Sequence, residues 1–510
     1  MRMLLAFLVQ GLFLAVVLYF ALYVLLELRV LLISQKVERR RLAELTRPVG
    51  DATIDGEALF RPPVSVLLPI CNESDVVARL IDAACRLRYP VKALQILVLD
   101  DSSDATTRLA QARVDQYASQ GINIRLVKRE SRKGYKAGNL VNGIQRSHGE
   151  FFAIFDADFV PPADFLLQTI PCFKDPELGF LQTGIGYENR DASFLTRFQA
   201  MEMGHQQYIT AGLSEDGDMA SLSGSSCVWR KACVDALGGW NDSTVTEDVD
   251  LGYRAQFGDW KYAYLRDVVS MSVLPETIRA FRVQRERWGR GLIHSAFKHV
   301  RQMLRQPLPL VKRLHAISLM FSSVLLAAIH VLVLLSLPLT YLVRVDGAGV
   351  RWGASAFFIV VAVWALGNAL GARRGARFED RPSIAKSVLH TCLYIAMFLP
   401  MSWYYFAGGI RAWFGVYNDF HRTPKGRDEL RSSTPRINTL LLIGEVLTFL
   451  YSLFTIGVAL KSGNLTLIPL NVTVCVGFGM VLYWTWQERR ACIRDTFSSS
   501  VSLHAAGDLE

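Results

Sequence analysis

The sequence predicts an α/β domain with a mostly parallel sheet, inserted between α-helical transmembrane segments. Of the 510 residues, 51% are hydrophobic and only 20% are charged, and the mean hydropathy is +0.23. Long uncharged runs occur near the N-terminus and in the C-terminal part of the chain. Between them, short β-rich runs alternate with helical stretches, which is typical of a parallel sheet. This composition excludes a disordered chain and an ordinary soluble enzyme.

The charge composition also indicates which kinds of partner the protein can bind. The 56 Lys and Arg against 46 Asp and Glu give a net charge of +10. The charged fraction is too low for a basic nucleic-acid-binding domain, so we expect no nucleic-acid partner. In a membrane protein, Lys and Arg accumulate in cytoplasmic loops, which explains the excess. The eight cysteines lack C-x-x-C and zinc-ligand spacings, which favours free thiols and no structural metal.

The first element is an uncharged apolar run over residues 4–26, long enough to cross a bilayer core of ~30 Å. It exceeds the length of a signal-peptide core, lacks a small-x-small cleavage site and precedes the basic residues 36–41. Residues 1–34 are therefore predicted to be an uncleaved transmembrane anchor whose C-terminal end lies in the cytoplasm. Residues 35–61 are expected to be a cytoplasmic linker.

The α/β domain is predicted over residues 62–275. Strands are expected at 64–69, 95–99, 124–127 and 151–155, and helices at 75–88, 105–120 and 136–146. Two strands run directly into acidic residues, Asp100-Asp101 and Asp156-Ala157-Asp158, at the edge where open α/β sheets bind ligands. Two such carboxylates suit a hard divalent cation that binds a diphosphate. Acidic pairs also cap helices and fill turns, so this motif alone leaves both interpretations open.

Two further motifs lie on helices. Thr246-Glu247-Asp248 opens a helical stretch over residues 249–257, where Thr246 is also an ordinary N-cap residue. Gln284-Arg285-Glu286-Arg287-Trp288 follows on a basic helix, within residues 276–315 that we expect to be amphipathic helices at the inner leaflet.

The C-terminal part contains five apolar runs, at residues 316–343, 354–370, 387–407, 439–460 and 465–486. The intervening segments 371–386 and 421–436 are both rich in Arg and Lys, so both are expected in the cytoplasm. The segment 387–417, broken by Pro400 and Gly408-Gly409, is then predicted to be a re-entrant or interfacial helical pair. The alternative is a full crossing that violates the charge rule. Residues 316–371 and 437–487 each form two transmembrane helices, with a re-entrant segment and loop over 372–436 and a cytoplasmic tail over 488–510.

Taken together, the acidic motifs and the Gln284 to Trp288 motif resemble the processive family 2 glycosyltransferases. These include cellulose, hyaluronan and chitin synthases and the cellulose-synthase-like mannan and glucomannan synthases. The strings FFAIFDADFVP, TVTEDVDLGYRA and LPETIRAFRVQRERWGRG are most similar to the mannan synthase-like branch. The resemblance implies a GT-A-type α/β domain. It also implies an inverting hexosyltransferase that polymerises a nucleoside-diphosphate sugar into a β-linked glucan, mannan or glucomannan and translocates it across the membrane.

The resemblance assigns a role to each motif residue. Asp248, beside Glu247, would be the general base, and Asp156 and Asp158 would hold Mg²⁺ or Mn²⁺. The donor nucleotide would contact Asn72, Glu73, Asp100, Asp101, Lys136, Asp156 and Arg287. The acceptor would contact Trp288, Gln284 and Arg285, and Trp288 outside such a motif would be a membrane-interface anchor.

A loop motif resembles the gating loop of cellulose synthases. It comprises Phe420, Thr423 and Lys425 in the string FHRTPKG, which could equally be a basic cytoplasmic loop. Residues 221–225 and 183–185 depart from the pattern of the family, which puts the acceptor path, the sugar and the linkage in doubt. Glu445, His330 and Asn368 lie in apolar segments, where they either line a sugar channel or satisfy neighbouring helices.

The implied partners are a UDP- or GDP-hexose, a growing polysaccharide, the lipid bilayer and envelope export proteins. The implied location is the inner membrane, as a multi-pass protein with a cytoplasmic catalytic domain. Two alternatives stay open: a non-processive lipid glycosyltransferase similar to glucosylceramide synthase, and a non-catalytic scaffold relative.

Overall fold

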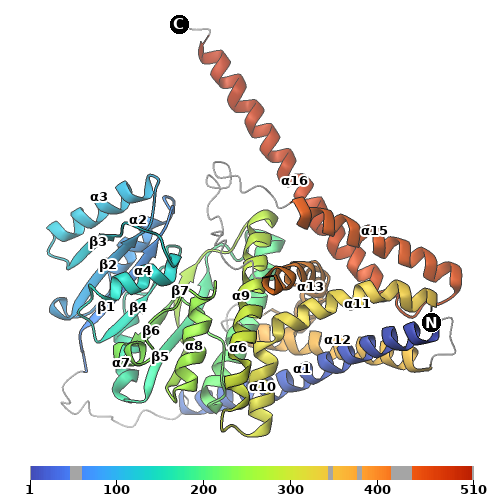
Figure 1. Ribbon diagram of the computed structural model, residues 1–510. Helices are drawn as coiled ribbons and strands as arrows, with labels where there is room; N and C mark the ends of the chain where they lie inside the picture. Colours follow the sequence, from blue (N-terminus) through green and yellow to red (C-terminus); the bar gives the residue numbers. More distant parts are fainter. Residues whose placement is uncertain (1, 46–59, 343–347, 376–381, 415–438, 508–510) are drawn as a thin grey trace.

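The computed structural model describes residues 2–45, 60–342, 348–375, 382–414 and 439–507. An α/β domain lies against a set of long apolar helices (Figure 1). Seven strands form a single mixed sheet in the order β3-β2-β1-β4-β6-β5-β7. They are β1 (Val64–Ile70), β2 (Leu94–Asp100), β3 (Ile124–Lys128), β4 (Phe151–Ile154), β5 (Leu178–Tyr187), β6 (Cys227–Arg230) and β7 (Lys261–Ser272).

The sheet is mostly parallel, as predicted. Strand β1 pairs in parallel with β2 and β4, β2 with β3, and β5 with β7, whereas β6 is antiparallel to β4 and β5. The four predicted strands correspond to β1 to β4. Strands β5 and β7 were not predicted because glycines interrupt the first, and Arg266 and Asp267 interrupt the second. Strand β6 has only four residues, too few to show a pattern.

Helices cover both faces of the sheet. Alternate residues of a strand face opposite sides, so Val66 of β1 packs with α2 and α3 while Leu67 packs with α4 and α8. The predicted helices correspond to α2, α3 and α4. The helices of the domain are α2 (Val77–Cys85), α3 (Thr106–Ser119), α4 (Tyr135–Ile144), α5 (Phe165–Thr169), α6 (Phe194–Asp216), α7 (Lys231–Ala236) and α8 (Glu247–Phe257), with 3-10 helices η1 (Val91–Ala93) and η2 (Ile170–Lys174).

The remaining helices form the apolar part of the molecule. Six helices of the described residues are long and apolar enough to cross a membrane: α1, α11, α12, α13, α15 and α16. In Figure 1, α1, α11 and α12 run side by side, α9 lies across them, and α13 is seen nearly end-on. Their bounds are α1 (Arg2–Leu45), α9 (Ile278–Leu304), α10 (Leu310–Met320), α11 (Ser322–Leu342), α12 (Ala348–Gly375), α13 (Ile384–Trp413), α15 (Thr439–Ser462) and α16 (Ile468–Gly507).

The helix bounds differ from the predicted segments at two places. The expected linker from residue 35 is helical up to Leu45, because α1 continues past its apolar run. The apolar run expected as one span from residue 316 is divided at Phe321 into α10 and α11. The carbonyl of Phe321 accepts a hydrogen bond from the Tyr19 hydroxyl at 3.0 Å, which supplies a partner where the helix is interrupted.

The predicted helical pair over residues 387–417 was wrong, because α13 is a single helix from Ile384 to Trp413. Gly477 of α16 packs against the carbonyl of Ala396 and the ring of Pro400, so a neighbouring helix covers the position that proline perturbs. Gly408 faces the backbone of α9, where a Cβ would lie 3.2 Å from the nitrogen of Arg290. This glycine allows a close helix contact instead of breaking α13.

Candidate active site

A cavity of about 590 Å³ opens at the carboxyl ends of β1, β2 and β4 and extends to the apolar helices. Most of the predicted site residues line it, although they come from distant parts of the sequence. The lining includes Glu73, Asp101, Lys136, Asp156, Asp158, Glu247, Asp248, Gln284, Arg285, Arg287 and Trp288. The fold therefore brings the acidic motifs and the motif of α9 to one site.

The first acidic pair lies in the turn that follows β4. The backbone N–H of Asp156 donates to the Ser225 hydroxyl at 2.9 Å, which ties this turn to the segment before β6. The side chain of Asp156 is one-third exposed, whereas Asp158 is buried and accepts a hydrogen bond from the Ser272 hydroxyl at 2.7 Å. The backbone of Asp156 and the carboxylate of Asp158 are thus held by different neighbours, and the Asp156 carboxylate is the more accessible one.

Lys136 lies beside this turn at the start of α4. Its ammonium is 2.6 Å from Oδ1 of Asp156 and 3.8 Å from Oε1 of Glu247, and it donates to the carbonyl of Gly224 at 3.1 Å. Burial lowers the pKa of Lys136, but the nearby carboxylates outweigh it and raise that pKa above its ordinary value. A permanent positive charge therefore joins the two acidic motifs.

The second acidic motif opens α8. Thr246 occupies the N-cap position, but its hydroxyl bonds to the Ser295 hydroxyl of α9 at 3.0 Å rather than to its own helix. Burial raises the pKa of Asp248 above its ordinary value, with a further contribution from Asp156, and Lys136 opposes it. Burial also raises the pKa of the adjacent Glu247. A carboxylate with a raised pKa that is still partly exposed to the cavity, as Asp248 is, is suited to accept a proton.

The position of Asp248 depends on a glycine. A Cβ on Gly224 would lie 2.7 Å from the Cβ of Asp248 and 2.8 Å from its Oδ2. Any side chain at residue 224 would therefore displace the carboxylate. Asp250, one turn into α8, is fully buried and bonds to Arg254 and His299, each at 2.8 Å, which fixes α8 against α9.

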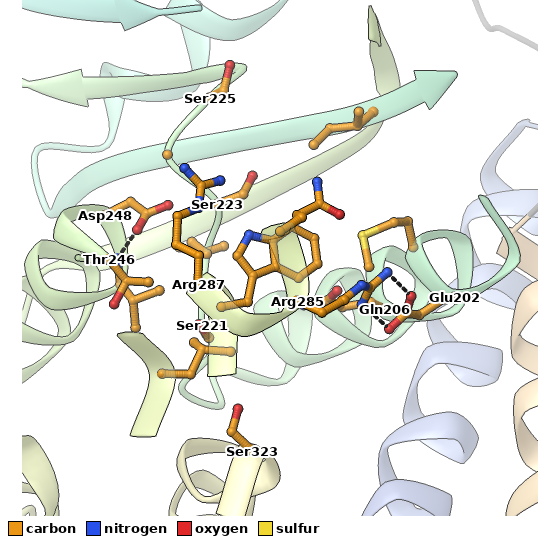
Figure 2. A pocket seen from close by; sticks show the side chains of 18 of the residues that line it. Glu202, Gln206, Ser221, Ser223, Ser225, Thr246, Asp248, Arg285, Arg287 and Ser323 are labelled. Atoms are coloured by element: carbon orange, nitrogen blue, oxygen red, sulfur yellow. Dashed lines mark hydrogen bonds and ion pairs between the residues drawn. The ribbon is translucent and has the colours of Figure 1, made fainter. Parts of the chain in front are cut away.

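Arg287 of α9 faces the same group of carboxylates. Burial lowers its pKa, while the charges of Glu247, Asp156 and Asp248 oppose that effect, so the guanidinium stays charged next to all three. Figure 2 shows Arg287 beside Asp248, with Ser223 and Ser225 lining the same wall. Lys136 and Arg287 thus provide two cations at the carboxyl edge of the sheet, where an anionic ligand could be held.

The predicted nucleotide residues differ in their surroundings. Asp101 lines the cavity, and its carboxylate accepts two hydrogen bonds from Arg129, at 2.7 and 2.6 Å. Asn72 and Asp100 are not among the lining residues; the first accepts a hydrogen bond from the Ser103 N–H and the second from the Ser102 N–H. Both order the loops around Asp101. Glu73, like Lys136, Asp156 and Arg287, lines the cavity.

Trp288 and Arg285 occupy the opposite wall. Arg285, predicted to contact the acceptor, lines the cavity, and its guanidinium forms a two-pronged ion pair with Glu202 of α6, with 2.6 Å between Nη1 and Oε1. The pair is drawn in Figure 2. The side chain is 1% exposed, and such a buried guanidinium needs an anionic partner. Its Cζ lies 4.7 Å from the centroid of the Trp288 ring. Arg285 therefore supports Trp288.

The far end of the cavity is lined by apolar helices, with aromatic side chains from α12 and α13 and with Ser323 of α11 at the lower edge of Figure 2. Asn368 lines this end, as one of the two alternatives proposed. Glu445 instead pairs with Arg282 of α9 at 2.6 Å, and His330 bonds to Ser402 at 3.2 Å. Both satisfy neighbouring helices and are not among the residues lining the cavity.

Sequence reasoning missed several residues that build the site: Arg129, Glu202, Gly224 and Ser225. Glu202 lies in the middle of a helix that carries no motif, so only the fold reveals it. The glycine and serine stand in the 221–225 segment, which departs from the pattern of the family. The predicted loop residues Phe420, Thr423 and Lys425 lie outside the described residues.

Comparison with known proteins agrees with this geometry. A family model described as glycosyltransferase like family 2 matches residues 62–291. The chain contains a family 2 glycosyltransferase domain. The matched residues run from the start of β1 to the middle of α9, so the glycosyltransferase domain includes every acidic motif of the cavity and Trp288.

Curated relatives match half of the chain or more. Glucomannan 4-beta-mannosyltransferase 2 of Arabidopsis thaliana is 39% identical over 264 residues, which cover 51% of this chain and 49% of its own length. Glucomannan 4-beta-mannosyltransferase 9 of the same plant is 34% identical over 338 residues, 64% of this chain and 62% of its own. The chain thus spans about half to three fifths of the length of these two relatives.

Among solved structures, the mannosyltransferase PcManGT from Pyrobaculum calidifontis, in complex with GDP-Man and Mn²⁺, is similar at 18% identity. The match covers 78% of this chain and 99% of that one, with a TM-score of 0.47.

The donor set of the site fits a divalent cation. Mg²⁺ and similar hard cations are commonly bound by one or two carboxylates, with phosphate oxygens of the substrate completing the shell. Asp156 and Asp158 provide two carboxylates in one turn, and the Lys136 ammonium against Asp156 shows that this position attracts a cation. Within the described residues, no group of three His, Cys, Asp or Glu forms a complete metal site, so phosphate oxygens would have to contribute.

Proposed function

We propose that this protein is an inverting membrane glycosyltransferase that adds hexose units from a nucleoside-diphosphate sugar to a β-linked polysaccharide. One observation carries the proposal. A single cavity joins the acidic motifs of the glycosyltransferase domain to aromatic side chains of the membrane helices. The glucomannan mannosyltransferases among the relatives favour mannose as the transferred sugar, with glucose as a second candidate.

The residues of the site suit a single displacement. Asp248 accepts the proton of the acceptor hydroxyl while that oxygen forms a bond to the anomeric carbon. The bond between this carbon and the diphosphate oxygen breaks, and the nucleoside diphosphate leaves with the electron pair. Attack from the face opposite the leaving group converts an α-linked donor into a β-linked product. Lys136 and Arg287 stabilise the negative charge that develops on the diphosphate.

Asp156 and Asp158 would hold Mg²⁺ or Mn²⁺ beside the same diphosphate. The cation would neutralise charge on the leaving group. With Asp156 on the cation, the Lys136 ammonium would be available to the phosphate oxygens.

The arrangement of the helices supports five membrane crossings and an interfacial α13. The carbonyl of Pro382, before α13, accepts a hydrogen bond from Arg373 at the end of α12 at 3.0 Å. Near the other end of α13, Arg411 pairs with Glu286 of α9 at 3.0 Å. Both ends of α13 therefore meet elements next to the glycosyltransferase domain. We place that domain in the cytoplasm and the product path through the bundle.

The test offers purified protein each donor separately, with Mg²⁺ or Mn²⁺: GDP-mannose, GDP-glucose, UDP-glucose and UDP-N-acetylglucosamine. Products are sized and digested with linkage-specific hydrolases, and Asp248→Asn is run in parallel. A large β-linked product from one donor, absent with the variant, supports the proposal. A short lipid-linked product would replace it with a lipid glycosyltransferase, and no turnover of any donor would favour a scaffold.

A further inference from the structure

Three charged and aromatic side chains form a continuous stack from α6 to the wall of the cavity. Glu202 of α6 pairs with Arg285 through both carboxylate oxygens. The guanidinium of Arg285 in turn lies between two rings of its own helix, with Cζ 4.8 Å from the centroid of Phe281 and 4.7 Å from that of Trp288. Glu202, Arg285 and Trp288 all line the cavity.

Burying this ion pair costs free energy, and it is not needed to fix α9 to its neighbours. Arg285 is 1% exposed, and burying a charge costs several kcal/mol unless it is paired. The same helix is already fixed to its neighbours by Arg282 with Glu445 and by Glu286 with Arg411, neither of which lines the cavity. The Glu202–Arg285 pair differs from these two because it ends on an aromatic ring of the site.

The geometry points to Glu202 and Arg285 as positioning residues for Trp288. The guanidinium covers one face of the indole, so a ligand can stack only on the opposite face. Because Glu202 holds the guanidinium through two bonds, the plane of that ring is fixed relative to Asp248. A sugar ring that packs on Trp288 is thereby held at a defined distance from the base.

This inference rests on the proposed function, in which Trp288 binds the acceptor. Beyond the role of the motif, Arg285 and Glu202 of α6 together set the affinity for the acceptor. Neither residue contacts the donor side of the cavity, where Lys136 and Asp156 lie. The pair should therefore change acceptor binding and leave donor binding unaltered.

The experiment measures initial rates against a short β-mannan oligosaccharide and against GDP-mannose, in Glu202→Gln and in the matched control Glu177→Gln. The control makes the same chemical change in an exposed ion pair with Lys261, outside the cavity. Glu202→Gln should raise the KM for the oligosaccharide about ten-fold, the size of a desolvated cation–π contact. The KM for GDP-mannose should stay within about two-fold of that of the unmodified protein. In Glu177→Gln both constants should be unchanged.

A second measurement separates positioning from stability. In a Trp288→Ala background, Glu202→Gln should have no further effect on the KM for the oligosaccharide, because the ring on which it acts is gone. Additive effects of the two substitutions would overturn the inference. So would parallel changes of both KM values. If Glu202→Gln does not fold, Glu202→Asp takes its place in the cycle, and loss of folding there too would show a purely structural pair.

Failure of the proposed function would look different. If the unmodified protein released no nucleotide from GDP-mannose, GDP-glucose or either UDP-sugar, the function itself would be wrong. If it transferred sugar and the cycle were additive, only the positioning role would be lost.

Discussion

Asp248 is a partly buried acid whose neighbours adjust its pKa. Burial raises its pKa, and Lys136 keeps that rise in check. The carboxylate also accepts a hydrogen bond from the N–H of Val249 at 2.8 Å. The side chain is therefore oriented by its own helix while its charge is governed by a separate one. The orientation and the charge of Asp248 can therefore be tested separately, with three predictions.

Replacement of the proposed base, Asp248, should separate activity from stability. Asp248→Asn is expected to lower kcat by about 10²- to 10⁴-fold, the usual contribution of a general base, with little change in the KM for the donor. Its thermal stability at neutral pH should rise, because the amide removes a buried charge. A carboxyl whose pKa is raised in the folded state favours folding at low pH and opposes it once pH exceeds that pKa. Nucleotide release and thermal unfolding in detergent measure the two effects, and equal losses of both would contradict the assignment.

The raised pKa of Asp248 also predicts how kcat/KM depends on pH. Asp248 must be deprotonated to act, so kcat/KM should fall as pH decreases through its pKa. That acidic limb should lie above the ordinary range of an aspartate, since burial favours the protonated form. The profile of kcat/KM against pH tests this. A limb at the ordinary aspartate value of about 4 would show that the carboxylate is solvated.

Gly224 should be intolerant of any side chain. Alanine there would place a Cβ 2.7 Å from that of Asp248 and push the carboxylate away. We expect kcat to fall by about 10²-fold while the protein still folds, because small displacements of catalytic groups have large effects. Gly204→Ala is the matched control, since a Cβ at that glycine of α6 meets nothing within 4 Å. Unaltered kinetics in Gly224→Ala would mean that Asp248 is not the base.

At the scale of elements, the helices and strands that could be predicted from the sequence are those in which apolar residues recur without interruption. Strands β1 to β4 and helices α2, α3 and α4 were found because their apolar positions repeat regularly. Strand β7 was not, because Arg266 and Asp267 fall within it. Pro400 and Gly408 were predicted to interrupt the segment 387–417, but α13 is continuous because neighbouring helices pack against both positions. The motifs likewise predicted which residues share the cavity, whereas Glu202 could not be found because its role exists only through the packing of α6 against α9.

The contact between α9 and α15 gives a prediction at this scale. Glu445 is fully buried, and Arg282 is its ionic partner. Glu445→Ala should destabilise the protein by about 3–5 kcal/mol, since it leaves a guanidinium buried without its anion. The double substitution Arg282→Met with Glu445→Leu should recover most of that loss. Thermal unfolding of both variants checks this. Asp235→Ala, which breaks an exposed pair with Lys231, should change stability little.

For the whole molecule, the testable feature is the path of α13. If it lies along the membrane surface, the end of α12 and the start of α15 are on one side. A hydrogen bond of 2.8 Å from Arg266 to the carbonyl of Arg374 places the end of α12 next to the glycosyltransferase domain. Single cysteines in a cysteine-free protein, Arg374→Cys and Thr439→Cys, should then react with an impermeant maleimide in vesicles of the same orientation. Labelling from opposite sides would establish a sixth crossing.

Helix α9 is joined to nearly every neighbour. It contacts α15 through Arg282, α6 through Arg285, α13 through Glu286 and α8 through Ser295. Few residues of α9 can be substituted without a compensating substitution in a neighbouring helix. We therefore expect the sequence of α9 to change slowly. The segment 221–225 contains no charged side chain and therefore forms no ion pairs. It is held by hydrogen bonds, such as those from the Asp156 N–H to the Ser225 hydroxyl and from the Ser223 N–H to Gln182. Divergence in substrate, whether natural or selected in the laboratory, should therefore start in that segment and spread to the helix last.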